Sequence, residues 1–463
     1  MSPYPKPIDA PSQELLQRCV HCGFCLPTCP TYAVLGVEMD SPRGRIRLME
    51  TVWEGRVSAD SVDFAKHIDQ CLDCRACETA CPSGVEYGKL VEGARANLVV
   101  ARPRGVLERV ARTLAFRFLL PSPTRLALFA RLSVLAKRLG AGAVLRAVGL
   151  GRLADLLALV PKRASSRSLP ALIPAVGARR GRVALFTGCV MRAAFADTNA
   201  ATARVLARNG IEVLVPGGTG ASAADGEQTC CGALHAHAGA REDSRRLARK
   251  NIALLEKLDV DAIVVNAAGC GAHLKGYGWL LKDDRAWSQR ASAFSLRIRD
   301  ASEALAGFGL VARPGTLRSR AAYDDPCHLL HGQRISAQPR ELLAAIPGLT
   351  VVPLAEADMC CGSAGTYNVT QPELSRALLD RKMANVLASG AELLVTANPG
   401  CQMQLEAGVR ASGKRVTVMH LMDVLDLAYG GSEERLRRDE RVDERSRGGE
   451  AQAAKRAEPS AKK

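Results

Sequence analysis

The spacing of apolar residues changes along the chain and divides it into segments. Between residues 101 and 178, leucine, valine and phenylalanine recur at helical intervals with arginine or lysine between them, as in VLERVARTLAFRFLL and TRLALFARLSVLAKRLG. Such spacing predicts amphipathic helices with one apolar face and one cationic face. Two interpretations are open: a packed helical layer whose cationic face is solvated, which we favour, or a surface that lies on anionic lipid.

Short apolar runs alternate with amphipathic segments from residue 179 to residue 430, and the pattern occurs twice. RVALFTGCV corresponds to RAAYDDPCHL, TCCGALHAHAG to MCCGSAGTYNV, and VDAIVVNAAGC to AELLVTANPGC. Each half therefore has the order strand, Cys, helix, strand, Cys-Cys-Gly, helix, strand, Cys. Strands that alternate with helices predict parallel βαβ units, so we expect tandem Rossmann-like repeats.

Two helix starts carry local signals. In DSPRGRIRLME, Asp40 or Ser41 can cap a helix whose first turn accommodates Pro42. In the second half, Thr370 with Glu373 has the form of a capping box. We therefore expect helices to begin near residues 42 and 371.

Eight cysteines form two matching runs, CVHCGFCLPTCP at 19–30 and CLDCRACETACP at 71–82. Three thiolates two residues apart can hold three corners of a 4Fe-4S cube in a tight loop, and the remote cysteine of the other run supplies the fourth ligand. We predict two 4Fe-4S clusters on this basis. Their ligands are Cys19, Cys22, Cys25 and Cys81 for the first cluster, and Cys71, Cys74, Cys77 and Cys29 for the second.

A pair of zinc sites is the alternative for these runs. Zinc prefers two CxxC pairs, or Cys with His, separated by a dozen or more residues, which the two matched runs do not resemble. Arg43, Arg45 and Arg47 follow the first run. They could raise the potential of a cluster, but arginines on a helix face are more often solvated, and we expect that here.

Adjacent cysteines followed by glycine occur once in each half. Glycine tolerates a bend that directs both sulfurs to one side, and the other cysteines lie where strands end, at the edge of a parallel sheet where ligands bind. We expect one four-thiol site in each half, occupied by a further iron–sulfur cluster, by zinc, or by no metal as a redox-active thiol site. The two sets are Cys189, Cys230, Cys231 and Cys270, and Cys327, Cys360, Cys361 and Cys401.

The formal net charge of +16 points to anionic partners. A cluster-stabilised nucleic-acid-binding protein is a remote alternative, because only 4% of residues are aromatic and no groove-reading motif is present; we expect no nucleic acid partner. The N-terminus has no export pattern and no run of 18 uncharged apolar residues occurs. These features predict a cytoplasmic protein, with peripheral contact to the inner face of the cytoplasmic membrane as an option.

Together, the cluster runs and the two Cys-Cys-Gly repeats resemble the iron–sulfur subunit of glycolate oxidase, also called glycolate dehydrogenase, over about residues 15 to 430. The segments CCGALHAHAG, NAAGCGAHLKGYG, CCGSAGTYN and ANPGCQMQ are similar to that subunit in particular. The resemblance implies an electron-transfer subunit of an oxidoreductase. It would receive electrons from flavin-containing subunits that oxidise glycolate to glyoxylate, and pass them toward a membrane quinone.

No GxGxxG nucleotide fingerprint is present, so we expect no catalytic residue for substrate oxidation in this chain. Related functions stay open, namely an iron–sulfur subunit of a lactate or glycerol-3-phosphate dehydrogenase or of a heterodisulfide-reductase-like complex. The wider family often closes each thiol site with CxxC, whereas His273 and Gln404 stand at those positions here. His235, His237 and His328 could relay protons, but we favour a role in orienting cysteines or capping helices.

The predicted fold class is α/β with an α-helical N-terminal part. Its segments are a helical two-cluster 4Fe-4S ferredoxin domain at 1–100, a basic amphipathic helical linker at 101–178, a first cysteine-rich domain at 179–312, a second at 313–430, and a charged tail at 431–463. We expect the tail to be disordered, because it cannot bury enough apolar area to offset its ordering entropy.

Overall fold

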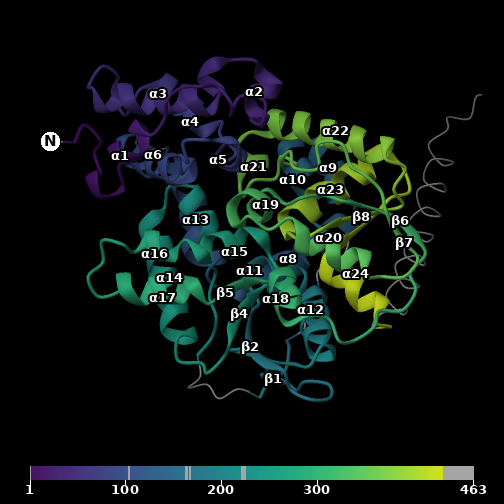
Figure 1. The fold of residues 1–463 in the computed structure, drawn as a ribbon. Helices are drawn as coiled ribbons and strands as arrows, with labels where there is room; N and C mark the ends of the chain where they lie inside the picture. The colour runs from purple at the N-terminus through teal and green to yellow at the C-terminus, as the bar shows by residue number, and fades with distance from the viewer. Residues whose placement is uncertain (1, 103–104, 162–164, 166–167, 221–225, 431–463) are drawn as a thin grey trace, which may run out of the picture.

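The computed structural model describes residues 2–102, 105–161, 165, 168–220 and 226–430 (Figure 1). The predicted charged tail at 431–463 lies outside the described residues. The purple N-terminal helices lie across the top of the view in Figure 1, above two α/β halves. The predicted class, α/β with a helical N-terminal part and parallel repeats, is confirmed.

Six α-helices form the N-terminal part, and a small apolar core around Met49, Phe64 and Leu90 holds them together. The predicted cap is confirmed: the Ser41 hydroxyl accepts a hydrogen bond from the backbone N–H of Gly44 at 3.0 Å, and Pro42 is the first helical residue. The helices are α1 (Gln13–Gln17), α2 (Pro30–Leu35), α3 (Pro42–Trp53), α4 (Val62–Asp69), α5 (Ala76–Ala80) and α6 (Tyr87–Ala101).

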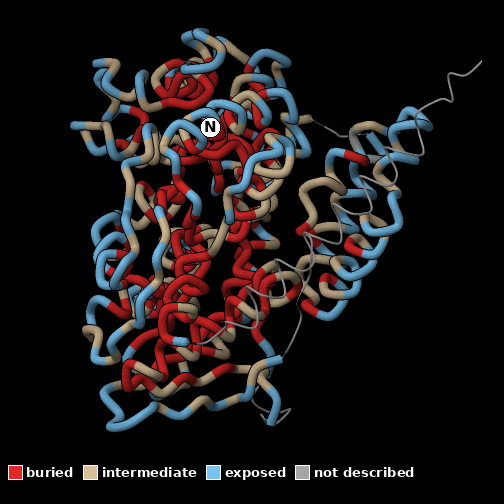
Figure 2. Tube along the Cα trace, turned by 90° about the vertical axis from the view of Figure 1, so that its right-hand side faces the viewer, coloured by how far each residue is buried: buried red, intermediate tan, exposed pale blue. Residues whose placement is uncertain are grey.

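The linker segment is helical, as its spacing predicts. It contains α7 (Val106–Thr113), a π-helical turn η3 (Leu114–Leu119), α8 (Pro123–Arg138), α9 (Ala141–Ala147) and α10 (Gly151–Leu159). In Figure 2 these helices form a separate, largely exposed layer on the right. Among the described residues no single helix is long and apolar enough to span a bilayer, although the bent pair Glu108–Leu119 and Pro123–Arg138 would suffice by length and composition alone.

The first half contains a five-stranded sheet in the order β1-β3-β2-β4-β5, parallel except for the pairing of β1 with β3. Strand β1 lies ahead of residue 179, so the sheet begins before the predicted boundary of this half. The strands are β1 (Leu172–Ile173), β2 (Gly181–Phe186), β3 (Ile211–Leu214), β4 (Ala262–Val265) and β5 (Ile298–Asp300).

Successive residues of β2 enter two different cores. Leu185 packs with α12 (Ala196–Arg208) and α18 (Ala301–Phe308), whereas Phe186 packs with α14 (Arg241–Leu255) and α17 (Ser288–Leu296). Because successive side chains on a strand point to opposite faces, this apolar strand requires helices on both sides.

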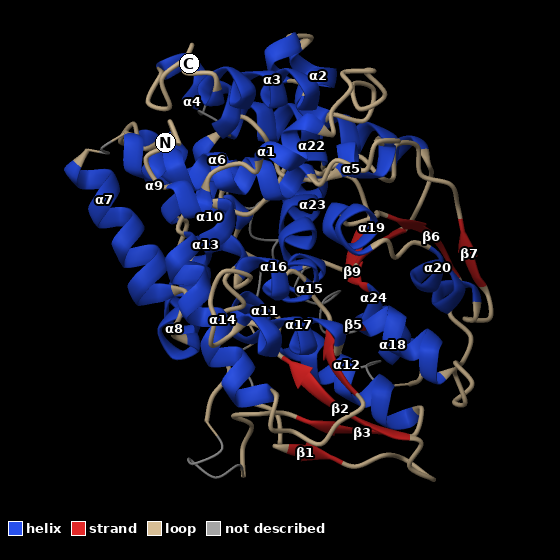
Figure 3. Cartoon of the chain, turned by 60° about the vertical axis from the view of Figure 1, so that its left-hand side comes forward, coloured by secondary structure: helices blue, strands red, loops and turns tan. Residues whose placement is uncertain are grey.

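The second half repeats this arrangement with a parallel sheet in the order β7-β6-β8-β9 (Figure 3). Its strands are β6 (Ser319–Tyr323), β7 (Leu349–Val351), β8 (Leu393–Thr396) and β9 (Thr417–His420). Its helices include α19 (Cys327–Gln333), α20 (Ala337–Ala344), α21 (Tyr367–Thr370), α22 (Pro372–Ala388), α23 (Pro399–Ser412) and α24 (Leu421–Ala428).

The predicted capping box at the start of α22 is wrong. Gln371 occupies the cap position and makes no side-chain cap bond, and Thr370 ends the preceding helix α21. The hydroxyl of Thr370 instead donates to the carbonyl of Thr366, because the tertiary fold turns the chain into α21 immediately before α22.

The two halves share one core. Helices α12 and α18 of the first half and α20 and α24 of the second contribute to the same apolar cluster, and the Thr198 hydroxyl donates to the buried Asp423 carboxylate at 2.8 Å. Arg204 adds a two-pronged ion pair to Asp426 at 2.9 and 2.6 Å. The halves are therefore packed as one body, and the thiol sites at their strand ends have fixed relative positions.

Candidate metal centres

The cysteines of the two N-terminal runs gather in two adjoining hollows. Cys19, Cys22, Cys25 and Cys81 line the first hollow, and Cys29, Cys71, Cys74 and Cys77 line the second. Cys77 also borders the first hollow. The structure thus brings together the four members of each predicted ligand set, with the remote cysteine of each run beside the other run.

Both runs share one backbone path. His21 and Gly23 in the first run, and Asp73 and Arg75 in the second, have positive φ values of 54°, 89°, 55° and 63°. Alternation between left- and right-handed residues turns successive backbone N–H groups toward one side, which creates an anion-binding concavity. The N–H of Asp73 accordingly donates to the Cys71 sulfur at 3.3 Å. These loops suit the sulfides and thiolates of an iron–sulfur cluster.

Burial disfavours the ionised, thiolate form of these cysteines when no metal is bound. It raises the pKa of the Cys25 thiol to about 11, and it raises the pKa values of Cys74 and Cys77 well above the usual value for cysteine. Positive charge from bound iron would compensate for this desolvation. The sulfur donor sets and the loop geometry therefore fit two iron–sulfur clusters.

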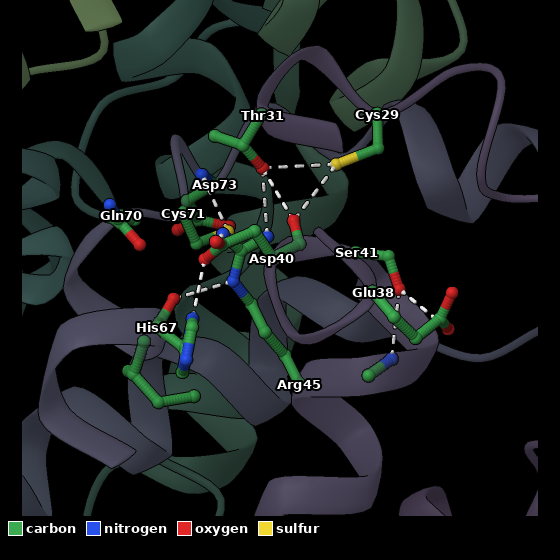
Figure 4. A network of polar contacts seen from close by, with 12 residues as sticks. Cys29, Thr31, Glu38, Asp40, Ser41, Arg45, His67, Gln70, Cys71 and Asp73 are labelled. Atoms are coloured by element: carbon green, nitrogen blue, oxygen red, sulfur yellow. Dashed lines mark hydrogen bonds and ion pairs between the residues drawn. The ribbon is translucent and has the colours of Figure 1, made fainter. Parts of the chain in front are cut away.

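Arg45 is buried rather than solvated, contrary to our expectation for the three arginines. Figure 4 shows its guanidinium within a network in which it donates to the carbonyl of His67 at 2.6 Å, to the Thr31 hydroxyl at 3.0 Å and to Asp40 at 3.3 Å. The Thr31 hydroxyl lies 3.3 Å from the Cys29 sulfur. Arg45 thus supports Cys29 through Thr31, while Arg47 is exposed and pairs with Glu50.

The first four-thiol set forms where β2 and β4 end. Cys189 begins α11 (Cys189–Ala194), Cys270 lies in α15 (Ala268–Lys275), and the adjacent Cys230 and Cys231 precede α13 (Ala233–His237). The Cys189 and Cys230 sulfurs are 3.4 Å apart, and those of Cys231 and Cys270 are 3.3 Å apart.

The second four-thiol set occupies the equivalent place in the other half. Cys327 begins α19 and Cys401 lies in α23. The Cys360 thiol lies beside those of Cys327 and Cys361, and the Cys401 thiol lies beside that of Cys361. The structure therefore brings together all four members of each predicted set.

The glycine of each Cys-Cys-Gly bend has no room for a side chain. Gly232 and Gly362 have φ values of +91° and +86°. A Cβ on Gly232 would lie 2.6 Å from the Ser244 hydroxyl, and one on Gly362 would lie 2.5 Å from the carbonyl oxygen of Ser375. Each bend is therefore pressed against the following helix, α14 or α22, which fixes the direction of both sulfurs.

His273 and Gln404 have the same structural role in the two halves. His273 lies 2.9 Å from the Ser244 hydroxyl, and the Gln404 amide donates to the Ser375 hydroxyl at 3.0 Å. Burial lowers the pKa of His273 to about 3, so this ring is neutral. Both side chains contact the serine that packs against the glycine bend. His273 and Gln404 therefore have a structural role at the position where the wider family often has the second cysteine of a CxxC pair.

A buried lysine distinguishes the second thiol set from the first. Lys382 is 1% exposed and donates to the carbonyls of Glu356 and Ala357 at 2.8 and 2.9 Å, and it pairs with Asp324 at 3.1 Å. At the equivalent position of α14, the neutral Asn251 donates to the Cys230 carbonyl at 3.0 Å. Sequence analysis missed this difference, although alignment of the two halves contains it.

The charge of Lys382 affects the neighbouring thiols. Hydrogen bonds from Cys360 and Cys401, with a contribution from Lys382, lower the pKa of Cys361 well below the usual value. In the first set, the pKa values of Cys189 and Cys231 are raised well above it. Cys361 thus differs from these two thiols, although the pKa values of its neighbours Cys360 and Cys401 are also raised well above the usual value.

The three histidines near the thiol sites contact other groups than cysteines. His235 lies 2.7 Å from the carbonyl of Phe116, and His328 lies 2.8 Å from the carbonyl of Asp73. The His237 ring approaches the carboxylates of Asp73 and Glu92. Two of these rings thus reach the second cluster loop from the cysteine-rich halves.

We expect the fourth ligands to be exchanged between the two runs. Cys29→Ser and Cys74→Ser should change the electron paramagnetic resonance (EPR) signal of one and the same reduced cluster, because both cysteines line the second hollow. Cys81→Ser and Cys22→Ser should both change the signal of the other cluster, because these cysteines line the first hollow. Iron should fall by about four per chain in each variant, the content of one cluster. A Cys29→Ser spectrum that matches Cys22→Ser would contradict this assignment.

We expect Lys382→Met to destabilise the protein by about 3–5 kcal/mol, because it leaves the Asp324 carboxylate buried and unpaired. The double variant Lys382→Met with Asp324→Asn should recover part of this loss. Arg381→Met, which removes a neighbouring exposed ion pair, should cost at most about 1 kcal/mol. Anaerobic urea unfolding measures all three, and equal midpoints for Lys382→Met and wild type would refute the role of the pair.

Comparison with known proteins places the chain among iron–sulfur proteins. It matches the family described as "4Fe-4S dicluster domain" over residues 15–85 and the family described as "Cysteine-rich domain" over residues 183–275 and 321–406. The dicluster match supports iron–sulfur clusters in the N-terminal part. The cysteine-rich matches cover both repeats.

Two relatives match this chain over nearly their full length, and a third matches about half of it. The "Probable glycolate oxidase iron-sulfur subunit" of Bacillus subtilis is 41% identical over 430 residues, covering 90% of this chain and 94% of the relative. The "Glycolate oxidase iron-sulfur subunit" of Escherichia coli is 37% identical, covering 90% and 95%. "Lactate utilization protein A" of Exiguobacterium is 32% identical but covers 53% of this chain and 96% of the relative. The chain therefore belongs to the glycolate oxidase iron–sulfur subunit family.

Proposed function

We propose that this chain carries electrons from flavin-containing subunits that oxidise glycolate to glyoxylate, toward a membrane quinone. Relatives that match over nearly their full length are named for glycolate oxidase, whereas those named for lactate utilization match only about half of this chain. This coverage favours glycolate. A lactate-oxidising complex is the second candidate, since a relative named for lactate utilization is 32% identical over 245 residues.

The observation that carries the proposal is a continuous row of sulfur ligands. Cys22, in the first hollow, is exposed at the surface. Cys77 borders both hollows, and Cys74 of the second packs in one cluster with Cys360 and Cys327 of the second thiol set. Bound clusters would each exchange one electron. The row thus leads from the surface toward the interior of the second half.

The surface beside Cys22 suits contact with a partner subunit. Val20 and Phe24 flank this cysteine and are 68% and 66% exposed. Apolar residues clustered around a redox site are typical of a protein–protein contact. We assign this rim to the flavin-containing partner.

The two four-thiol sets are proposed to hold a metal–thiolate centre each, either a further iron–sulfur cluster or zinc. Buried sulfurs 3.3–3.4 Å apart form compact donor sets in the first half, and four sulfurs meet in the second. Sulfur donors in this number suit both occupants. Iron, sulfide and zinc counts on a Cys230→Ser, Cys360→Ser double variant beside wild type distinguish them.

We expect glycolate to reduce the N-terminal clusters when the chain is assembled with its flavin-containing partners under anaerobic conditions. Cys74→Ser should reduce electron delivery to a water-soluble quinone analogue at least tenfold while leaving direct dye reduction by the flavin subunits intact, because the row of sulfur ligands is then interrupted. EPR and quinone reduction measure this. Cluster reduction by lactate or glycerol-3-phosphate, but not by glycolate, would overturn the choice of substrate.

We also propose a cytoplasmic location with peripheral contact to the inner face of the membrane. The linker helices expose apolar side chains at helical spacing, including Leu128, Leu132 and Leu135, which are 58%, 56% and 51% exposed. Exposed arginines such as Arg125 and Arg138 accompany them. Apolar side chains combined with basic ones favour anionic lipid surfaces.

We expect the protein to bind vesicles of mixed anionic and neutral phospholipid at low salt, and to bind them less at high salt because ions screen the basic residues. Leu132→Glu should weaken binding at least tenfold in a sedimentation assay. Leu296→Glu is the matched control, since Leu296 is 75% exposed on α17 of the first cysteine-rich half, outside the linker. Absence of wild-type binding, or equal loss in both variants, would contradict membrane contact through the linker.

A further inference from the structure

Three ionisable side chains meet where the N-terminal domain contacts the first cysteine-rich half. Asp73 belongs to the second cluster loop, Glu92 to α6 and His237 to the last turn of α13. Their side chains are 1%, 8% and 14% exposed. The Nδ1 atom of His237 lies 2.8 Å from Oδ2 of Asp73 and 3.1 Å from Oε1 of Glu92. None of the three residues is a cysteine or a predicted cluster ligand, and the function proposed above does not use them.

The geometry of these contacts is not that of hydrogen bonds. Nδ1 of His237, both carboxylate oxygens of Asp73 and Oε1 of Glu92 are buried without a hydrogen-bond partner. One potential ligand atom from each residue lies within 4.8 Å of the others. Donor atoms around a tetrahedral ion with bonds of about 2.1 Å are about 3.4 Å apart, so binding would widen the two close contacts by a few tenths of an ångström.

The charge of the surroundings favours a cation. Two carboxylates face one guanidinium, since Arg75 lies 3.5 Å from Glu92 and 3.8 Å from Asp73. The rings of His328 and His273 lie 5.2 and 6.5 Å from that of His237. Burial lowers the pKa values of these two rings to about 4 and about 3, so they add no positive charge. With a neutral His237, the side chains of Asp73, Glu92 and Arg75 together carry one net negative charge, and a second guanidinium, that of Arg95, donates to the carbonyl of His237 at 3.2 Å.

The His237 ring already attracts a cation in the form of a proton. Burial alone lowers the pKa of His237, but the carboxylates of Asp73 and Glu92 outweigh this effect and raise it to about 9. A divalent ion would replace this proton and use the same ring nitrogen. Nitrogen and carboxylate donors together suit Zn²⁺ and its first-row neighbours.

We propose that Asp73, Glu92 and His237 form a site for one divalent transition-metal ion such as Zn²⁺, separate from all sixteen cysteines. The ion would join three segments that are distant in sequence: the second cluster loop, helix α6 and helix α13. It would therefore fasten the N-terminal domain onto the first cysteine-rich half.

The test counts metal in the full-length chain, prepared anaerobically with its clusters, incubated with Zn²⁺ and desalted. Glu92→Gln and His237→Gln should each hold about one zinc per chain fewer than wild type, with iron unchanged, because each removes one of three ligands. Any zinc held by the cysteine sets is common to all samples and cancels in this difference.

His331→Gln is the matched control. His331 is also a buried ring at the boundary between the N-terminal domain and a cysteine-rich half, but it contacts the Thr79 hydroxyl and the Asp358 carbonyl. It should retain the wild-type zinc count. Equal zinc in wild type and both site variants, with iron intact, would overturn the proposal and leave an imidazolium held by two carboxylates.

A second measurement does not depend on any variant. Mn²⁺ prefers oxygen and nitrogen donors to thiolates, so wild-type protein should bind one Mn²⁺ that Zn²⁺ displaces, as measured by EPR of the free ion. Absence of Zn²⁺-displaceable Mn²⁺ on wild type would overturn the proposal even if the variants lost their clusters.

Discussion

Burying an ionised cysteine side chain is unfavourable unless a compensating charge lies nearby, and the sites of this protein are built around that constraint. Most of the sixteen cysteines are buried; burial raises the pKa values of Cys25 and Cys77, and a hydrogen bond with Cys230 together with burial raises that of Cys189. A thiolate in such a place requires a metal, a hydrogen-bond donor or a buried cation nearby. The short N-terminal helices follow from this requirement, since metal–ligand bonds replace much of the apolar core that so small a domain would otherwise need.

The protein provides this support in different ways at different sites. At the N-terminal runs, left-handed loop residues orient backbone N–H groups toward the hollows, and Arg45 reaches Cys29 through Thr31. At the second thiol set, the buried Lys382 is paired with the Asp324 carboxylate. The first set has Asn251 instead, and the pKa values of Cys189 and Cys231 are raised there. Two repeats with one backbone plan therefore differ in the polar group behind the thiol set, a lysine–aspartate pair in one and an asparagine in the other.

The junction of the domains is also polar. Tyr367 of the second half donates to the carbonyl of Gln70, and Arg245 of the first half pairs with the fully buried Asp9. His237 and His328 reach the second cluster loop from either half. The N-terminal domain therefore contacts both repeats through directional interactions, and these fix the orientation of the second hollow relative to the thiol sets better than apolar packing alone would.

Short-range signals in the sequence determined much of this protein. The spacing of the eight N-terminal cysteines, the Ser41–Pro42 helix start, the Cys-Cys-Gly bends and the repeated order of strands and helices depend on neighbours within a few residues, so they can be predicted without the fold. Tertiary structure alone decided the roles of Arg45, Lys382, His273 and Gln404, and it overrode the capping signal at Thr370. It also brought together Asp73, Glu92 and His237, because burial and charge pairing depend on segments that are distant in sequence and meet only when the domains pack.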